Sequence, residues 1–156
     1  MGRFATGVTV VTALADGAPH GMTANAFMAG SLEPPLCVVS IRKAARLHGY
    51  VSASRRYAVS ILAEEQRHLS DHFAGRRVAG MTPEFAWVDG MPVLVRGIAG
   101  IVADVVDTSD CGDHTLFIGR ISRMGARSAS PLLFFAARYG RVETSEPIER
   151  VGPMFW

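Results

Sequence analysis

Cysteine and histidine are the residue types in this sequence that most readily bind metals, and their spacing gives no metal motif. The two cysteines, Cys37 and Cys111, are too far apart to form a CxxC pair. His68 and His72 stand four residues apart on a predicted helix, which suits two metal ligands. Leu69, however, occupies the place where a metalloprotease has glutamate, so a solvated helix face explains the pair better. We therefore predict no metal site.

His114 differs from the other histidines in its surroundings. It follows Gly112-Asp113 and opens an apolar stretch, Thr115–Ile121, that predicts a strand. A histidine between a turn and a strand can lie at the rim of a barrel, where ligands bind. It can equally cap or pack the turn, and the spacing favours neither role.

Side-chain sets for covalent catalysis are missing from the sequence. There is no GxSxG nucleophile elbow, no recognisable Ser–His–Asp set and no carboxylate pair in an apolar setting. The GxGxxG and Walker phosphate motifs are missing too, which excludes a Rossmann or P-loop interpretation. Such a domain either binds a molecule passively or uses the chemistry of a cofactor.

Small residues crowd the stretch Thr23-Ala24-Asn25-Ala26. Small side chains let a flat ligand approach the backbone, whose N–H and C=O groups can then bond to the ligand edge. The same pattern also fits a strand packed beneath a neighbour. Arg42, Lys43 and Arg46 begin a predicted helix, where cations favour an anion, although solvated surface charge explains them as well.

Many short apolar runs with two inserted helical patterns predict an antiparallel, mainly β domain, closed or partly closed into a barrel. The expected strands are 7–14, 20–27, 36–41, 57–62 and 115–121, with two strand lengths over 92–106 bent near Gly97 or Gly100 and a short apolar segment at 132–135. The expected helices are 44–54 and 64–73, and 76–90 reads as a surface excursion. Cys111 is placed in a polar turn, Ser109–Asp113, and Cys37 in the core.

The bulk composition fits one domain over residues 1–156. A formal net charge of +2 is too small to indicate nucleic acid or an anionic membrane surface as partner. No apolar run reaches membrane-spanning length and the first residues lack a signal-peptide core, so a cytoplasmic protein is expected. With 49% hydrophobic and 19% charged residues, we expect a second subunit to cover some apolar surface, and the end Met154-Phe155-Trp156 to pack on this subunit or its partner.

A series of segments along nearly the whole chain resembles the flavin reductase family, whose members serve as the small component of two-component flavin-dependent monooxygenases. The segments are Gly2–Thr12, His20–Phe27, Ser31-Leu32 with Pro35-Leu36, Val39–Ile41, Tyr57–Leu62, Gln66 with Leu69-Ser70 and Phe73–Gly75, Gly112–Gly119, and Pro131–Phe135 with Tyr139. Their order and spacing together carry the resemblance.

The resemblance implies a flavin-binding split β-barrel, antiparallel and Greek-key-like, that forms a homodimer. It implies that NADH or NADPH reduces FMN or FAD, and that the reduced flavin diffuses to a partner monooxygenase. Two alternatives stay open: a split-barrel flavoprotein that keeps its flavin and reduces another acceptor such as a corrinoid, and a non-catalytic flavin-binding or sensing domain.

The resemblance also implies roles for particular residues. His114, Arg138 and Tyr139 would meet the nicotinamide dinucleotide, with His114 in a positioning role. Flavin would be bound by Thr23, Ala24, Asn25, Ala26, Phe27, Ser31, Ser40, Arg46, Phe73, Ala74 and Gly75. Many relatives have a Ser-x-Thr type phosphate motif where this chain has Ala44–Leu47, so Arg46, Lys43 and backbone donors would carry more of the phosphate.

Overall fold

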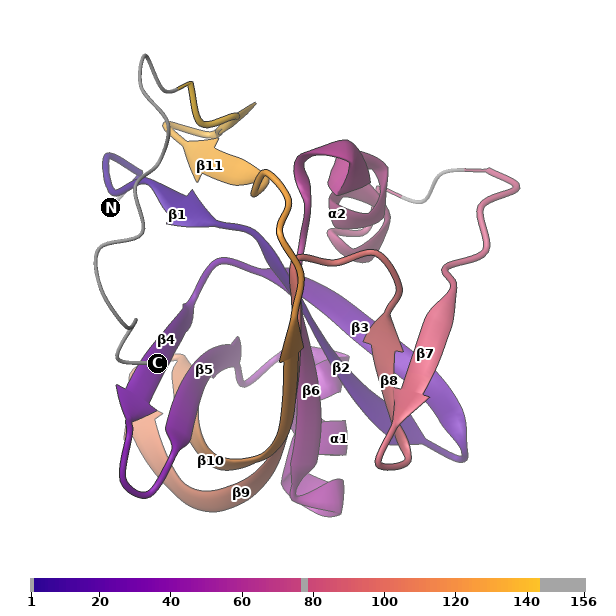
Figure 1. The fold of residues 1–156 in the computed structure, drawn as a ribbon. Coiled ribbons are helices and arrows are strands. Elements are labelled where there is room, and N and C mark those ends of the chain that lie inside the picture. The colour runs from indigo at the N-terminus through magenta and orange to yellow at the C-terminus, as the bar shows by residue number, and fades with distance from the viewer. Residues whose placement is uncertain (1, 77–78, 144–156) are drawn as a thin grey trace.

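The computed structural model describes residues 2–76 and 79–143, and its fold is mainly β with two α-helices, as predicted (Figure 1). Its largest sheet has seven antiparallel strands in the order β3-β2-β6-β9-β10-β5-β4. These strands are β2 (Thr9–Ala15), β3 (Ala18–Ala24), β4 (Phe27–Ser31), β5 (Leu36–Arg42), β6 (Arg56–Ile61), β9 (Ala99–Cys111) and β10 (His114–Ala126).

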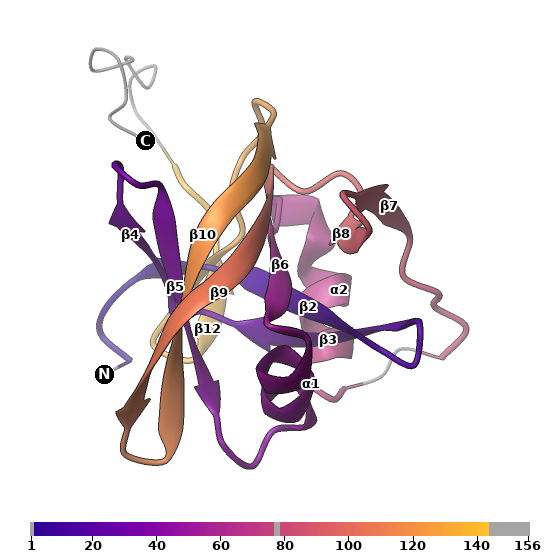
Figure 2. The same ribbon diagram turned by 90° about the horizontal axis from the view of Figure 1, so that it is seen from below.

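The two longest strands, β9 and β10, bend the sheet. Their register shifts twice, between Ile118 and Gly119 and between Ile121 and Arg123. Such bulges kink a strand and increase its twist. Figure 1 shows the pair curving beneath the molecule, and Figure 2 shows it twisting across the other strands. This curvature brings β5 and β4 round toward the N-terminal strands.

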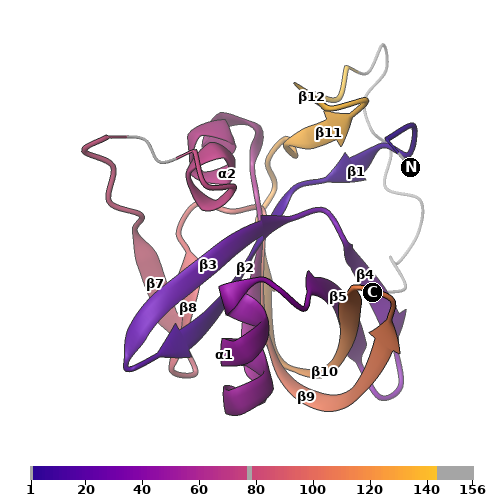
Figure 3. The same ribbon diagram turned by 180° about the vertical axis from the view of Figure 1, so that it is seen from behind.

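Two small sheets flank the large one. β1 (Thr6–Gly7), β11 (Leu133–Phe135) and β12 (Arg138–Gly140) form one of them, with Thr6 opposite Phe134. β7 (Phe85–Val88) and β8 (Met91–Leu94) form the other. Figure 3 shows β1, β11 and β12 at the same end of the molecule as the second helix, α2. Segments from both ends of the described chain therefore meet there.

The helices lie close to the predicted positions. α1 (Arg46–Ser54) buries Leu47 and Val51. The predicted helix over 64–73 begins as a 3₁₀ turn, η1 (Glu64–Gln66), and continues as α2 (Arg67–Phe73), which buries Leu69 and Ser70. Gly75 follows with a positive φ of 90°, a conformation that glycine adopts easily, and so ends the helix where the sequence predicts. No helix among the described residues is long and apolar enough to cross a membrane.

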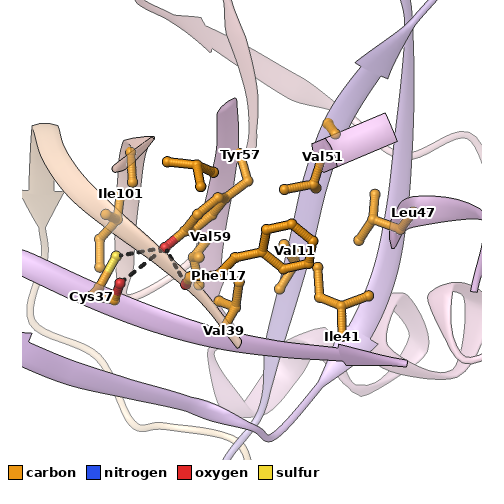
Figure 4. Packing of buried hydrophobic residues seen from close by; sticks show 13 residues of the cluster. Val11, Cys37, Val39, Ile41, Leu47, Val51, Tyr57, Val59, Ile101 and Phe117 are labelled. Atoms are coloured by element: carbon orange, nitrogen blue, oxygen red, sulfur yellow. Dashed lines mark hydrogen bonds between the residues drawn. The ribbon is translucent and has the colours of Figure 1, made fainter. Parts of the chain in front are cut away.

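The core lies inside the curved sheet around Tyr57 and Phe117 (Figure 4). The Tyr57 hydroxyl donates to the carbonyl oxygen of Cys37 at 3.1 Å, so the buried phenol is satisfied. Burial raises the pKa of both Tyr57 and Cys37. Gly119 makes room for this arrangement, because a Cβ there would lie 2.4 Å from the Tyr57 oxygen. The prediction that Cys37 belongs to the core is confirmed.

The predicted single strand over 20–27 is wrong. β3 ends at Ala24 and β4 begins at Phe27, with Asn25 and Ala26 between them. β3 pairs with β2, whereas β4 pairs with β5. The chain therefore changes its sheet partner inside the stretch of small residues, which a pattern of residue types does not reveal.

Two further details correct the predictions from sequence. The excursion over 76–90 contains β7, which pairs with β8 through a tight turn at Asp89-Gly90, where both φ values are positive. Cys111 is the last residue of β9, opposite His114, so the turn is limited to Gly112-Asp113. The predicted packing of Met154–Trp156 lies outside the described residues.

Candidate binding site

A pocket of about 930 Å³ opens where the end of β3, α2 and the β11–β12 hairpin meet. Its size is near the upper end for small-molecule sites, which are roughly 300–1,000 Å³. The lining residues are Val8, Thr23, Ala24, Asn25, Arg67, Ser70, Asp71, Ala74, Arg76, Phe134, Ala137, Arg138 and Tyr139. The pocket thus joins the small-residue stretch to the C-terminal hairpin.

The first wall is fixed by contacts between β3 and α2. The Thr23 hydroxyl donates to the carbonyl oxygen of Ser70 at 2.7 Å. Gly21, two residues earlier on the same face of β3, lies beneath the ring of Phe73, and a Cβ there would be 2.7 Å from the ring. The missing side chain lets α2 lie directly on β3. Thr23, Ala24 and Asn25 then line the pocket with small side chains.

The second wall is the β11–β12 hairpin, and Tyr139 fixes it to α2. The Tyr139 hydroxyl lies 2.9 Å from Ser70 Oγ and donates to Asp71 Oδ1 at 3.1 Å. Its ring packs edge-on against Phe134 at 5.5 Å between centroids. The guanidinium carbon of Arg67 lies 4.8 Å from the centre of the ring, a cation–π contact. Helix and hairpin are therefore held together by both polar and aromatic contacts.

The hairpin turns through two alanines in a left-handed conformation. Ala136 and Ala137 have φ values of 49° and 61°. A two-residue turn of this kind favours asparagine and glycine, because a Cβ is strained at positive φ. The contacts of Tyr139 oppose this local strain. Ala137 lines the pocket and keeps that side open.

The charged side chains among the described residues that line the pocket are three arginines and one carboxylate. Arg76 makes an ion pair with Asp71, and Arg67 lies 3.8 Å from the same carboxylate. Arg76 is the main cause that holds the pKa of Asp71 below its ordinary value, and the Tyr139 hydrogen bond adds to it. Arg138 is the third arginine. The excess of positive charge suits a phosphate-bearing ligand.

A second group of predicted residues lies along β5 and the start of β10. The Ser40 N–H donates to the carbonyl oxygen of Ala26 at 3.0 Å. His114 pairs with Arg42 across the sheet, and its Nδ1 lies 2.8 Å from Asp113 Oδ1. The His114 hydrogen bond is the main cause that lowers the pKa of Asp113. The His114 side chain is 38% exposed, so it can contact a bound molecule.

The structure brings together only some of the residues predicted to bind ligands. Thr23, Ala24, Asn25, Ala74, Arg138 and Tyr139 line the pocket, and Phe73 and Gly75 flank Ala74. Ala26 and Phe27 lead from the pocket to β5, which carries Ser40 and pairs with β10, the strand that begins at His114. Ser31 stands at the far end of β4, and Arg46 begins α1, both outside the pocket lining.

Sequence reasoning missed Arg67, Ser70, Asp71 and Arg76 as pocket residues. Arg67 and Asp71 are four residues apart, the spacing at which a helix places opposite charges together. That signal was present in the sequence, but it indicates only a helix surface. Among residues 2–76 and 79–143, no three His, Cys, Asp or Glu side chains gather closely enough to hold a metal ion.

The chain is similar to flavin reductases over most of its length. The family described as flavin reductase like domain matches residues 1–143. An NADH-dependent flavin reductase of Rhodococcus sp is 38% identical over 146 residues, covering 92% of this chain and 83% of that protein. The flavin-dependent monooxygenase reductase subunit HsaB of Rhodococcus jostii is 34% identical over 155 residues, covering 95% and 77%.

Solved structures give the same picture. Flavin reductase PheA2 is 44% identical, with a TM-score of 0.90, and the match covers 92% of this chain and 94% of that one. The NADH:FAD oxidoreductase SgcE6 of Streptomyces globisporus, in complex with NAD and FAD fragments, is 32% identical with a TM-score of 0.86, covering 92% and 89%. Both likenesses extend well beyond a shared fold class.

Proposed function

This chain belongs to the family of flavin reductase-like domains, and we propose on this premise that it is an NADH-dependent flavin reductase of a two-component system. A bound flavin would supply the redox chemistry, since it can take up a hydride from NADH and pass the electrons on to an acceptor. The sequence offers no covalent catalytic set, which agrees with chemistry that belongs to the bound molecules. The protein supplies binding and orientation.

The observation that carries this proposal is the pocket, whose lining combines small side chains with arginines. Thr23, Ala24 and Asn25 leave room for a flat ring system against the backbone. Arg67, Arg76 and Arg138 supply charge for a phosphate or pyrophosphate group. The shape and the charge of the pocket therefore both fit a flavin nucleotide.

We assign the remaining residues as the resemblance to the family implies. Ala26, Phe27, Ser31, Ser40, Arg46, Phe73, Ala74 and Gly75 belong, with the first wall, to flavin binding. His114, Arg138 and Tyr139 belong to nicotinamide binding, where they orient the dinucleotide. Hydride transfer requires the two rings to be held about 3–3.5 Å apart, so small displacements of either wall lower the rate.

The proposed partner is a flavin-dependent monooxygenase that receives reduced flavin by diffusion. HsaB is named as a monooxygenase reductase subunit, which supports this partner class. We further propose that the described residues form a single split-barrel domain and that it is a homodimer. The curvature of β9 and β10 supports the barrel, and the exposed apolar side chains Met28 and Leu32 at the edge formed by β4 support the dimer.

A steady-state assay tests the proposed function. NADH and NADPH are each combined with FMN, FAD and riboflavin, and oxidation is followed by absorbance. We expect NADH oxidation that depends on added flavin, and a colourless protein after gel filtration. A protein that stays yellow supports a tightly bound flavin and another acceptor. No oxidation with either nicotinamide and any flavin contradicts the proposal.

A further inference from the structure

Asp71 is the acidic side chain among the described residues that line the pocket. We propose that Asp71 determines ligand specificity, because it limits the attraction of the pocket for phosphate and orients the arginines that would contact the phosphate. This inference rests on the proposed function, in which flavin nucleotides and nicotinamide dinucleotides are the phosphate-bearing ligands. Nothing in the sequence pattern marked Asp71 for this role.

The carboxylate of Asp71 contacts several of the side chains on one side of the pocket. Its carboxylate receives hydrogen bonds from Arg76 and from the Tyr139 hydroxyl and lies 3.8 Å from Arg67. The side chain of Asp71 is 25% exposed, whereas those of Arg67 and Arg76 are each 66% exposed. The carboxylate thus lies deeper, and the two guanidinium groups extend from it toward solvent.

This arrangement sets the charge that an entering ligand meets. Among the described residues that line the pocket, three arginines and one aspartate leave two positive charges in excess. A phosphate that approaches Arg67 or Arg76 must compete with Asp71 for the same guanidinium protons. The carboxylate also repels the phosphate directly. Asp71 therefore weakens phosphate binding, which suits a protein that must release its flavin.

Two ligands carry the relevant phosphate, and the experiment separates them. FMN differs from riboflavin by one phosphate group, and NADPH differs from NADH by one phosphate group. If the pocket holds the flavin phosphate, a change at Asp71 alters the FMN-to-riboflavin affinity ratio. If it holds the additional phosphate of NADPH, the change alters the ratio of kcat/KM for NADPH and NADH.

The decisive variant is Asp71→Asn, which removes the charge and keeps an oxygen that accepts from Tyr139. The matched control is Asp104→Asn, because Asp104 pairs with Arg56 at 2.7 Å and does not line the pocket. FMN and riboflavin binding are measured by quenching of flavin fluorescence at low salt. Across roughly 7 Å in a mostly aqueous pocket, Coulomb's law gives an effect of about threefold to tenfold on a dianionic phosphate.

We expect Asp71→Asn to bind FMN more tightly by that factor with riboflavin unchanged, or to raise the NADPH-to-NADH ratio of kcat/KM to the same extent. The gain should shrink with added NaCl, and Asp71→Glu should keep the wild-type ratios. The proposal is overturned if neither ratio differs from that of Asp104→Asn, or if Asp71→Asn weakens the binding of FMN. Asp71→Ser serves as the neutral variant if Asp71→Asn does not fold. The binding arm needs no turnover, so its result stands even if wild-type protein fails to oxidise NADH.

Discussion

Replacing Gly21 by alanine should push α2 away from β3 and so disturb the pocket. The added Cβ would lie 2.7 Å from Cδ1 and Cε1 of the Phe73 ring and 3.3 Å from Val10 Cγ1. Phe73 ends α2, and the same helix carries Ser70 and Asp71 on its pocket side. The hydrogen bond from Thr23 to Ser70, at 2.7 Å, depends on the same close approach.

The size of the effect follows from the overlap. Carbon atoms in contact prefer about 3.5–4.0 Å, so the Phe73 ring, or the helix that carries it, must move by close to 1 Å. Overpacking of this kind lowers the free energy of unfolding by roughly 1–3 kcal/mol. For a chain of this size, that corresponds to a drop in Tm of about 2–12 °C. If the displaced wall costs flavin binding a free energy within the same range, roughly 1.4 kcal/mol, flavin affinity falls about tenfold.

Urea unfolding and flavin fluorescence titration measure the two consequences separately. Gly125→Ala is the matched control, because Gly125 also lies in a strand and a Cβ there meets nothing within 4 Å. The control should be neutral or slightly more stable, by up to about 1 kcal/mol, since alanine restricts the unfolded chain. Equal stability and equal flavin affinity of the two variants would refute the argument that Gly21 admits α2.

The remaining predictions concern single polar groups. His114→Ala should raise the KM for NADH more than the flavin dissociation constant, and the opposite pattern would contradict its positioning role. Tyr139→Phe should lower stability by about 1–2 kcal/mol in urea unfolding, because it removes the hydrogen bonds to Ser70 and Asp71, whereas an unchanged midpoint would show that they contribute nothing. Arg76 holds the pKa of Asp71 below its ordinary value, so the resulting stability is present above about pH 4 and is lost as the pH falls through the lowered pKa. Asp71→Asn should flatten this acid dependence of the urea midpoint, and identical pH profiles would refute the linkage.

Most of the fold was predictable from local patterns. β2, β5, β6 and the start of β10 are short, apolar and rich in β-branched residues, and their sequence pattern suffices. The sequence pattern predicts one strand where the structure has β3 and β4, because no proline or glycine separates them. The two strands are separated by a change of pairing partner. β7 was missed although Asp89-Gly90 is a strong hairpin signal, because the residues before it are mixed in composition.

The site was less predictable than the fold. The resemblance to a family supplied Thr23, Tyr139 and their neighbours, which the residue types alone left open. Asp71 and Arg76 could not be assigned to the pocket from the sequence. Their place in it depends on contacts with Tyr139, which lies far along the chain and is brought to them by the β11–β12 hairpin. Long-range contacts of this kind have no periodic signature in a single sequence.

The placement of the two pocket walls has a consequence for biosynthesis. One wall contains Thr23–Asn25 and the other ends at Tyr139, and Thr6 pairs with Phe134. At about 5–20 residues per second, the ribosome makes the first wall several seconds before the second. A nascent chain that has already paired β2 with β3 still lacks the hairpin, so it offers a ligand only half of the pocket. Binding of flavin to the nascent chain would therefore report that translation has passed β12.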